Sequence, residues 1–130
     1  MQQTILKTIN DLYKWRNNFE ADINFVPTMG NLHQGHLKLI QESNKDQSNR
    51  TLVSIFINPL QFNNKRDLKT YPKTIEKDIK LAFSSGANAI FLPSEKEILN
   101  SKTLCHQKAS KKLSSKMCGK SREGHFDGVC

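Results

Sequence analysis

The stretch FVPTMGNLHQGHLKLI, residues 25–40, decides the fold. A short apolar run stops at Pro27, a segment with Gly30 and Gly35 follows, and apolar residues then return at helical spacing. Proline cannot donate a backbone hydrogen bond and keeps its predecessor extended, so it marks a strand end. The stretch therefore predicts a strand at 23–26, a glycine-containing loop and a helix.

Two more apolar runs alternate with helical patterns along the chain. The run TLVSIFIN at 51–58 is nearly continuous, as expected of a parallel strand covered on both sides, and NAIFLP at 88–93 predicts a third strand. Helices are predicted at about 8–18, where Thr8 begins a capping-box pattern, and at 73–85. This alternation is typical of an α/β protein with a doubly wound parallel sheet and right-handed crossovers.

Prolines also indicate where a ligand site would lie. Each predicted strand runs up to a proline, at Pro27, Pro59 and Pro93. Because the strands are expected to be parallel, the loops that follow them lie along one edge of the sheet. Ligands of open α/β sheets bind outside this carboxyl edge. The fold alone therefore predicts the position of the site.

The loop after the first predicted strand carries residues suited to a polyphosphate. Gly30 and Gly35 allow positive φ or close approach of a ligand. His33 and His36 are three residues apart, so at the start of a helix their imidazoles lie on one side. A helix that begins near His36 presents unpaired amides, which form an anion site. The alternative is a capped helix with two solvated histidines, but the combined pattern favours the nucleotide site. The sequence of this loop matches neither the Walker loop of P-loop enzymes nor the G-x-G-x-x-G fingerprint of dinucleotide-binding proteins.

Length and composition narrow the class of protein. The 130 residues suffice for one domain, and no apolar run approaches the roughly 20 residues that cross a bilayer, so we expect a cytoplasmic protein without a membrane partner. Cys105, Cys118 and Cys130 have neither the number nor the spacing of a disulfide or metal framework. We interpret them as free thiols and predict no protein-bound metal.

The basic charge does not require a nucleic-acid partner. The net charge is +8, and residues 100–130 contribute most of it, with seven basic residues against two acidic ones. Sixteen of the twenty basic residues are lysine, whereas arginine has the planar fork that suits phosphate and base recognition. No aromatic residues alternate with the basic cluster. A solvated basic surface is the favoured interpretation, and no nucleic-acid partner is expected.

Four segments, in order, resemble one family. They are VPTMGNLHQGHLKLI, VSIFINPLQF at 53–62, TYPKTIEKDI at 70–79 and SREGHFDGV at 121–129. Together they are similar to the pantothenate synthetases, or pantoate-beta-alanine ligases. This family belongs to the nucleotidyltransferase superfamily, which shares its H-x-G-H motif with class I aminoacyl-tRNA synthetases. The resemblance implies a Rossmann-like sheet of the H-x-G-H nucleotidyltransferase type.

The resemblance also implies a reaction. Pantoate attacks the α-phosphorus of ATP, releasing pyrophosphate and forming pantoyl adenylate; the amine of beta-alanine then displaces AMP to give pantothenate. Magnesium accompanies the ATP as a substrate complex. Two alternatives stay open: another H-x-G-H adenylyltransferase acting on a phosphate-bearing substrate, and a non-catalytic product that is either a truncated fragment or a basic binding module.

Site residues follow from the matched motifs. The family pattern implies that His36 is the proton donor. Displacement at phosphorus depends mainly on stabilising charge, which instead favours His33 and His36 as hydrogen-bond donors to phosphate oxygens. Gln61 is expected to contact pantoate and beta-alanine, with Asn58 and Phe62 flanking that pocket, and Arg122 is a possible further contact. The predicted ATP-binding residues are Pro27, Thr28, Met29, Gly30, Asn31, Leu32, His33, Gln34, Gly35 and His36.

The chain departs from the family in its extent. The later lysine-bearing and Ser-Ser-Arg segments of the family, further pantoate contacts and a second domain have no counterpart before Cys130. We therefore expect residues 1–130 to be a single, incomplete N-terminal nucleotide-binding domain without its C-terminal domain, and to be inactive alone. The resemblance further implies a homodimer in the intact enzyme and, in some lineages, fusion to a cytidylate kinase.

Overall fold

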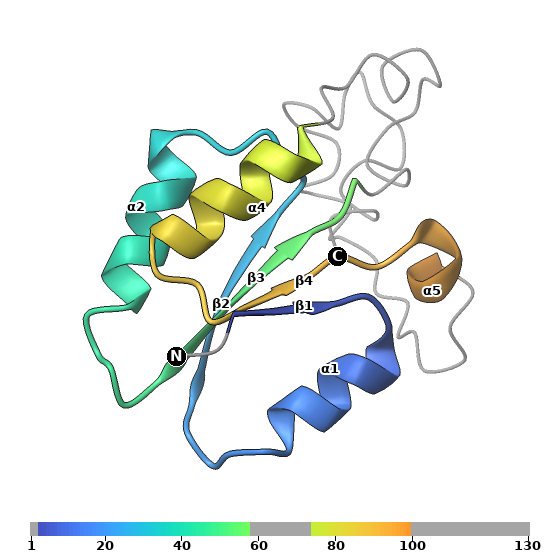
Figure 1. Ribbon diagram of the computed structural model, residues 1–130, viewed down its shortest axis with the longest axis horizontal. Helices are drawn as coiled ribbons and strands as arrows, with labels where there is room; N and C mark the ends of the chain where they lie inside the picture. The colour runs from blue at the N-terminus through green and yellow to red at the C-terminus, as the bar shows by residue number, and fades with distance from the viewer. Residues whose placement is uncertain (1–2, 58–73, 100–130) are drawn as a thin grey trace, which may run out of the picture. The chain divides into compact units, whose positions relative to one another are not determined.

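The computed structural model describes residues 3–57 and 74–99, which lie in one compact unit. Strands and helices alternate along this part of the chain, as predicted (Figure 1). In chain order the elements are β1 (Thr4–Leu6), α1 (Ile9–Arg16), β2 (Ile23–Thr28), α2 (Gln34–Ser43), β3 (Arg50–Ile55), α4 (Ile75–Ser84), β4 (Ala89–Phe91) and α5 (Glu95–Leu99).

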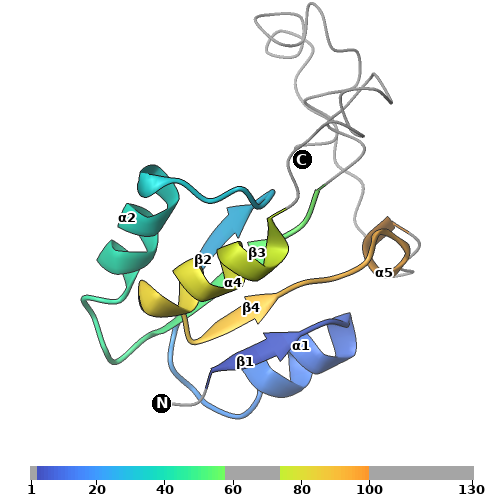
Figure 2. The same cartoon turned by 45° about the horizontal axis from the view of Figure 1, so that its top comes forward.

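The strands form one parallel sheet of order β1-β4-β3-β2. After β1 the chain crosses to the opposite edge of this sheet, where β2 lies, and then returns through β3 to β4, which is next to β1. Right-handed crossovers in opposite directions place their helices on opposite faces. Accordingly, α1 lies on one face and α2 and α4 on the other (Figure 1, Figure 2). The predicted doubly wound α/β class is confirmed.

Each face of the sheet has its own hydrophobic cluster, because successive strand side chains point to opposite faces. Val53 and Ile90, both fully buried, face α2 and α4, while Leu52 and Phe91 face α1. The first cluster contains Val26, Leu32, Leu37, Ile40, Val53, Ile55, Ala82, Ala87 and Ile90; the second contains Leu6, Leu52, Ala89 and Phe91, with Leu12 and Trp15 packed against it. The almost continuous apolar run of β3 thus reflects burial on both faces, as predicted.

The prolines do not mark the strand ends as closely as expected. β2 continues through Pro27 to Thr28, and Pro27 is in register with Ser54 of β3. The carbonyl of Thr28 accepts the Phe56 amide at 3.0 Å, so Thr28 presents its backbone polar groups to β3 and Pro27 faces the other way. Its missing N–H therefore removes no bond from the described ladder.

Other element boundaries also differ. β4 ends at Phe91, two residues before its proline, and β3 ends at Ile55, while Pro59 lies outside the described residues. The helix predicted at 8–18 is α1, and Thr8 caps it by accepting the Asp11 amide at 3.0 Å, which confirms the capping position. The helix predicted at 73–85 is α4. β1 and α5 were missed because three- and five-residue elements carry no clear periodicity.

No helix in the described ranges is long and apolar enough to cross a membrane. The three cysteines and the segment GHFDGV lie outside the residues that the structure describes. The sequence interpretation of those parts stays a prediction.

Candidate functional site

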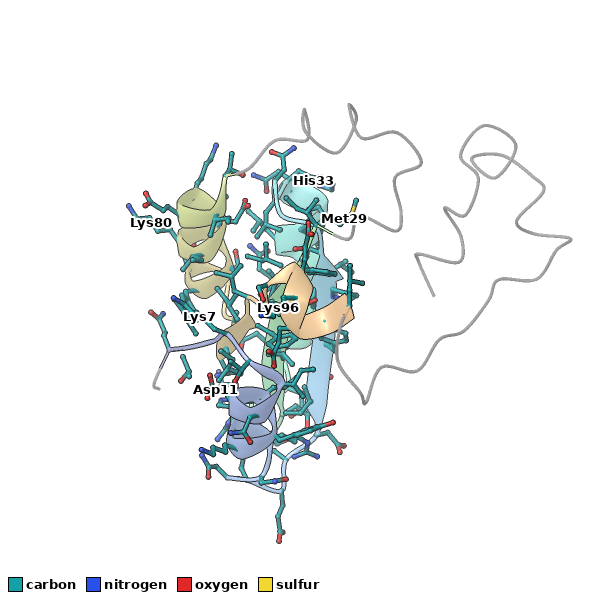
Figure 3. All side chains as sticks on the ribbon, turned by 90° about the vertical axis from the view of Figure 1, so that its right-hand side faces the viewer. Lys7, Asp11, Met29, His33, Lys80 and Lys96 are labelled. Carbon is teal, nitrogen blue, oxygen red and sulfur yellow. The ribbon has the colours of Figure 1, made fainter. Side chains whose placement is uncertain are left out.

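The loop from the end of β2 to the start of α2 lies at the carboxyl edge of the parallel sheet. Met29 and His33 both lie at this end of the molecule (Figure 3). The loop that follows β4 begins at the same edge, because all four strands are parallel. This is where the sequence predicted a ligand site.

The two histidines close the amino end of α2 with a reciprocal pair of hydrogen bonds. His33 is the N-cap residue, and its Nδ1 accepts the Gly35 amide at 3.0 Å. In return, Nδ1 of His36 accepts the His33 amide at 3.1 Å. The ring centroids are 4.0 Å apart. The prediction that the imidazoles lie on one side is therefore confirmed, and we call this arrangement the imidazole capping box.

This geometry corrects one sequence expectation. We expected a helix beginning near His36 with free amides for an anion. Instead, α2 begins at Gln34, and imidazole rings already accept from the amides of His33 and Gly35. The reason is that histidine at an N-cap accepts a hydrogen bond as asparagine or serine does. Fewer backbone donors are thus available than the sequence suggested.

The capping box also determines which ring nitrogen carries the proton. A nitrogen that accepts a hydrogen bond has no proton, so the neutral rings of His33 and His36 are protonated at Nε2. Within the described residues neither Nε2 has a hydrogen-bond partner. Two neighbouring N–H donors are consequently available for phosphate oxygens.

Gly35 is required by the same capping box. A Cβ on Gly35 would lie 2.8 Å from Cε1 and 3.0 Å from Nδ1 of His33. Contacts this short force one of the groups to move, so a side chain here would displace the ring. The glycine of H-x-G-H therefore makes room for the first histidine.

Partial burial and the neighbouring His33 lower the pKa of His36, and the carboxylate of Asp78 opposes them by raising it. The net shift is downward from 6.5. A pKa below 6.5 favours the neutral form of His36 at pH 7, in which its Nε2–H is available as a hydrogen-bond donor.

The backbone before the capping box is in an unusual conformation. Gly30 has φ of +81° and Asn31 has φ of +50°. The Gly30 amide donates to Oγ1 of Thr28 at 3.1 Å, and that hydroxyl donates to the Ser54 carbonyl at 2.9 Å. Positive φ is costly for a non-glycine residue and persists only where contacts enforce it.

Asp78 of α4 supplies such contacts. Its side chain, 1% exposed, accepts the Asn31 amide at 2.8 Å and the Leu32 amide at 2.9 Å, and the Thr74 hydroxyl at 3.0 Å. Asp78 was not among the residues predicted for the site. A usable signal existed, because this acid shares the apolar face of its helix with Ile79 and Ala82.

The predicted ATP-binding residues fall into two groups in the structure. Thr28, Gly30 and Leu32 are buried: the hydroxyl of Thr28 bonds to the loop and the strand, and the side chain of Leu32 packs in the core. Pro27, Met29, Asn31 and the residues from His33 to His36 are at least partly accessible. The predicted residues Asn58, Gln61, Phe62 and Arg122 lie outside the described residues. Their roles, like those of the loop residues, stay predictions.

Sequence comparison relates this chain to one family of known proteins. The family model described as pantoate-beta-alanine ligase matches residues 4–130. Two Prochlorococcus marinus proteins, each a bifunctional pantoate ligase/cytidylate kinase, are 54% (subsp. pastoris strain CCMP1986) and 48% (strain SARG) identical to this chain. The matches cover 100% and 99% of this chain but 26% of each relative. The chain thus spans about a quarter of the length of these relatives.

Solved structures show the same similarity. Pantoate-beta-alanine ligase from Francisella tularensis, complexed with beta-gamma ATP and beta-alanine, matches 98% of this chain and 49% of its own, with a TM-score of 0.88 and 38% identity. The enzyme from Thermus thermophilus matches 97% of this chain and 45% of its own, with a TM-score of 0.81 and 32% identity. Sequence and fold therefore agree, and the chain belongs to the pantoate-beta-alanine ligase family.

Proposed function

We propose that this chain provides the nucleotide-binding part of an ATP-dependent ligase that joins pantoate to beta-alanine. The observation that carries the proposal is the imidazole capping box, which leaves two Nε2–H donors at the carboxyl edge of the sheet. The ATP and beta-alanine of the Francisella complex support the choice of substrates. The family membership supports the choice of pantoate.

The proposed reaction has two displacements. A carboxylate oxygen of pantoate attacks the α-phosphorus of ATP, the bond to the β-phosphate oxygen breaks, and pyrophosphate leaves with the electron pair. The amine of beta-alanine then attacks the acyl carbon of pantoyl adenylate. The carbon–oxygen bond to AMP breaks, the nitrogen loses a proton, and pantothenate is formed.

In this scheme His33 and His36 act mainly through their positions. Their Nε2–H groups donate to phosphate oxygens and stabilise the charge that develops as pyrophosphate leaves. The capping box holds both rings before the substrate binds, so little reorganisation is needed. Gln61, with Asn58 and Phe62, is proposed for pantoate and beta-alanine, and Arg122 for an additional anionic contact.

The described side chains suit magnesium as part of the substrate rather than as a protein-bound ion. The described residues contain no group of three or more histidine, cysteine, aspartate or glutamate side chains that could hold a metal ion. Both oxygens of Asp78 are also occupied by donors. Magnesium usually reaches such sites bound to nucleotide phosphates. We therefore propose that it enters with ATP.

Pyrophosphate exchange tests the proposal on the polypeptide that the gene encodes. Labelled pyrophosphate should enter ATP when pantoate is present and beta-alanine is absent, because adenylate formation is reversible. Addition of beta-alanine should yield AMP and pantothenate in equal amounts. Exchange that requires a mononucleotide substrate instead of pantoate would favour another H-x-G-H adenylyltransferase, and absence of exchange with either would support a non-catalytic product.

A further inference from the structure

The segment TYPKTIEKDI, residues 70–79, resembles the family in sequence, but the proposed function assigns it no task. Its described part contains the buried Asp78. We propose that Asp78 is a positioning residue of the nucleotide site, whose carboxylate fixes the loop Gly30–Leu32 and thereby places the imidazole capping box. The inference rests on the proposed function of that site. It assigns a task to a residue that lies outside the H-x-G-H motif.

The loop forms a concave set of backbone donors around this carboxylate. Gly30 and Asn31 both have positive φ, and the next two amides, of Asn31 and Leu32, point to different oxygens of Asp78. Successive N–H groups in such turns bind anions. Hydrogen bonds to a charged acceptor are roughly twice as strong as neutral ones. The carboxylate therefore stabilises a backbone conformation that Asn31 would not adopt alone.

The approach between the loop and α4 favours glycine at position 30. A Cβ on Gly30 would lie 3.1 Å from Oδ2 of Asp78 and 3.4 Å from Cγ2 of Ile55. Its positive φ also disfavours a side chain. Gly30 and Asp78 thus act as a pair, one making room and the other supplying the anion.

This arrangement assigns the phosphate to the imidazoles. Because a protein carboxylate already fills the concave amide site, a negatively charged phosphate is repelled from it. The Nε2–H groups of His33 and His36 are then donors that the segment offers outside the carboxylate-filled site. Asp78 would consequently affect catalysis through the position of the rings, without touching ATP.

Burial makes a purely structural role for Asp78 a poor explanation. An isolated charge inside a protein is costly, and helix α4 would pack its apolar face better with a hydrophobic residue. The carboxylate accepts its three hydrogen bonds from the loop and from Thr74, and none of them comes from a basic side chain. Its side chain therefore serves the loop.

The test compares D78N with E76Q in the polypeptide that the gene encodes. Asparagine keeps the shape of Asp78 but replaces one acceptor by a donor, which cannot receive the second loop amide. Glu76 lies on the same helix and is exposed, so E76Q removes the same charge without touching the loop. We expect kcat/KM for ATP to fall about 10- to 100-fold in D78N, as for other residues that orient site groups, and to be unchanged in E76Q.

Two readouts separate positioning from general stability. Amide hydrogen exchange of Asn31 and Leu32 should accelerate in D78N while the core amides of Val53 and Ile90 stay protected. Kinetics should be measured well below the unfolding temperature of each variant. Wild-type kinetics in a folded D78N, or unchanged exchange at Asn31 and Leu32, would overturn the proposal.

A milder variant covers the case in which D78N does not fold. T74V removes the hydroxyl that donates to Asp78 and keeps both loop contacts. It should change exchange and kcat/KM in the same direction by a smaller factor, and wild-type values for both would count against the proposal. If the wild-type protein forms no pantothenate, the proposed function fails, and loop exchange in the variants still decides whether Asp78 holds the loop.

Discussion

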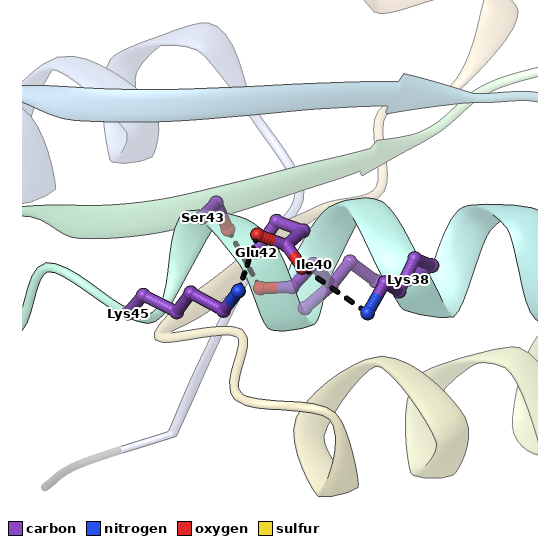
Figure 4. A network of polar contacts seen from close by, with 5 residues as sticks. All are labelled: Lys38, Ile40, Glu42, Ser43 and Lys45. Atoms are coloured by element: carbon purple, nitrogen blue, oxygen red, sulfur yellow. Dashed lines mark hydrogen bonds and ion pairs between the residues drawn. The ribbon is translucent and has the colours of Figure 1, made fainter.

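The two ends of α2 are held by different kinds of polar contact. At the amino end, His33 and His36 exchange hydrogen bonds with the backbone, and the preceding loop is tied to Asp78 of another helix. At the carboxyl end, Glu42 pairs with Lys38 at 3.1 Å and Lys45 at 2.8 Å (Figure 4).

The difference lies in the reach and the exposure of these contacts. The ion pairs of Glu42 stay within one segment and in water, where the lysines lower the pKa of Glu42 but hold no other element in place. The contacts at the amino end connect residues 46 and 47 positions apart and hold the loop that leads into the two histidines. Substitutions at the two ends should therefore affect different properties.

The largest effect is expected for H36A. The variant loses an Nε2–H donor and half of the capping box, so kcat should fall about 100- to 1,000-fold, the usual effect of removing a donor to developing charge. Pantoate-dependent pyrophosphate exchange measures it. Q41A, on an exposed position of the same helix, serves as the control and should keep wild-type activity. Wild-type kcat in H36A would show that the ring does not act in the reaction.

G35A should separate activity from stability. The new methyl group displaces the ring of His33, so kcat/KM should fall about 10- to 100-fold. Loss of the cap costs about 1 kcal/mol, and the better helix propensity of alanine returns a similar amount, so the free energy of unfolding should change little.

G86A is the matched variant at the other end of α2. Gly86 has φ of +117°, and a Cβ there would lie 2.7 Å from Nδ2 of Asn44, the C-cap residue of α2. We expect lower stability in urea unfolding with unchanged kcat/KM, the reverse of G35A. Identical behaviour of the two glycine variants would contradict the proposed difference between the helix ends.

A smaller effect is expected from pH. The pKa of His36 lies below 6.5 in the folded protein and at about 6.5 in the unfolded chain. Between the lowered pKa and 6.5, the unfolded chain therefore binds more protons than the folded one. The contribution of His36 to stability is complete above 6.5 and is lost as pH falls toward the lowered pKa. Urea unfolding across this range should show stability decreasing more steeply in the wild type than in H36Q. A steeper decrease in H36Q would reverse the assigned sign.

The smallest effect is expected for E42Q. The substitution removes both ion pairs, but all three side chains are largely solvated and screened. Neither the urea midpoint nor kcat/KM should differ from wild type within error. A stability loss as large as that of G86A would show that the carboxyl end of α2 depends on its charges more than its exposure suggests.

Much of the candidate site was predictable because its signals are close together in the sequence. His33, Gly35 and His36 lie within one turn, so their side-by-side arrangement follows from helical spacing. The role of Gly35 was less accessible, because it depends on the direction in which the His33 ring caps the helix. The place of Asp78 on the apolar face of α4 indicates that it is buried, but nothing in its local sequence connects it to the loop, so its role was missed.

The sequence by itself determined the alternation of strands and helices, the parallel class of sheet and the position of the histidine loop. Apolar periodicity, proline and glycine act on neighbouring residues, and these features depend on nothing more distant. Only the tertiary structure decided that β1 pairs with β4 and that Asp78 accepts the loop amides of Asn31 and Leu32. Such contacts join segments far apart in the chain, and they form because packing the two faces of the sheet brings those segments together.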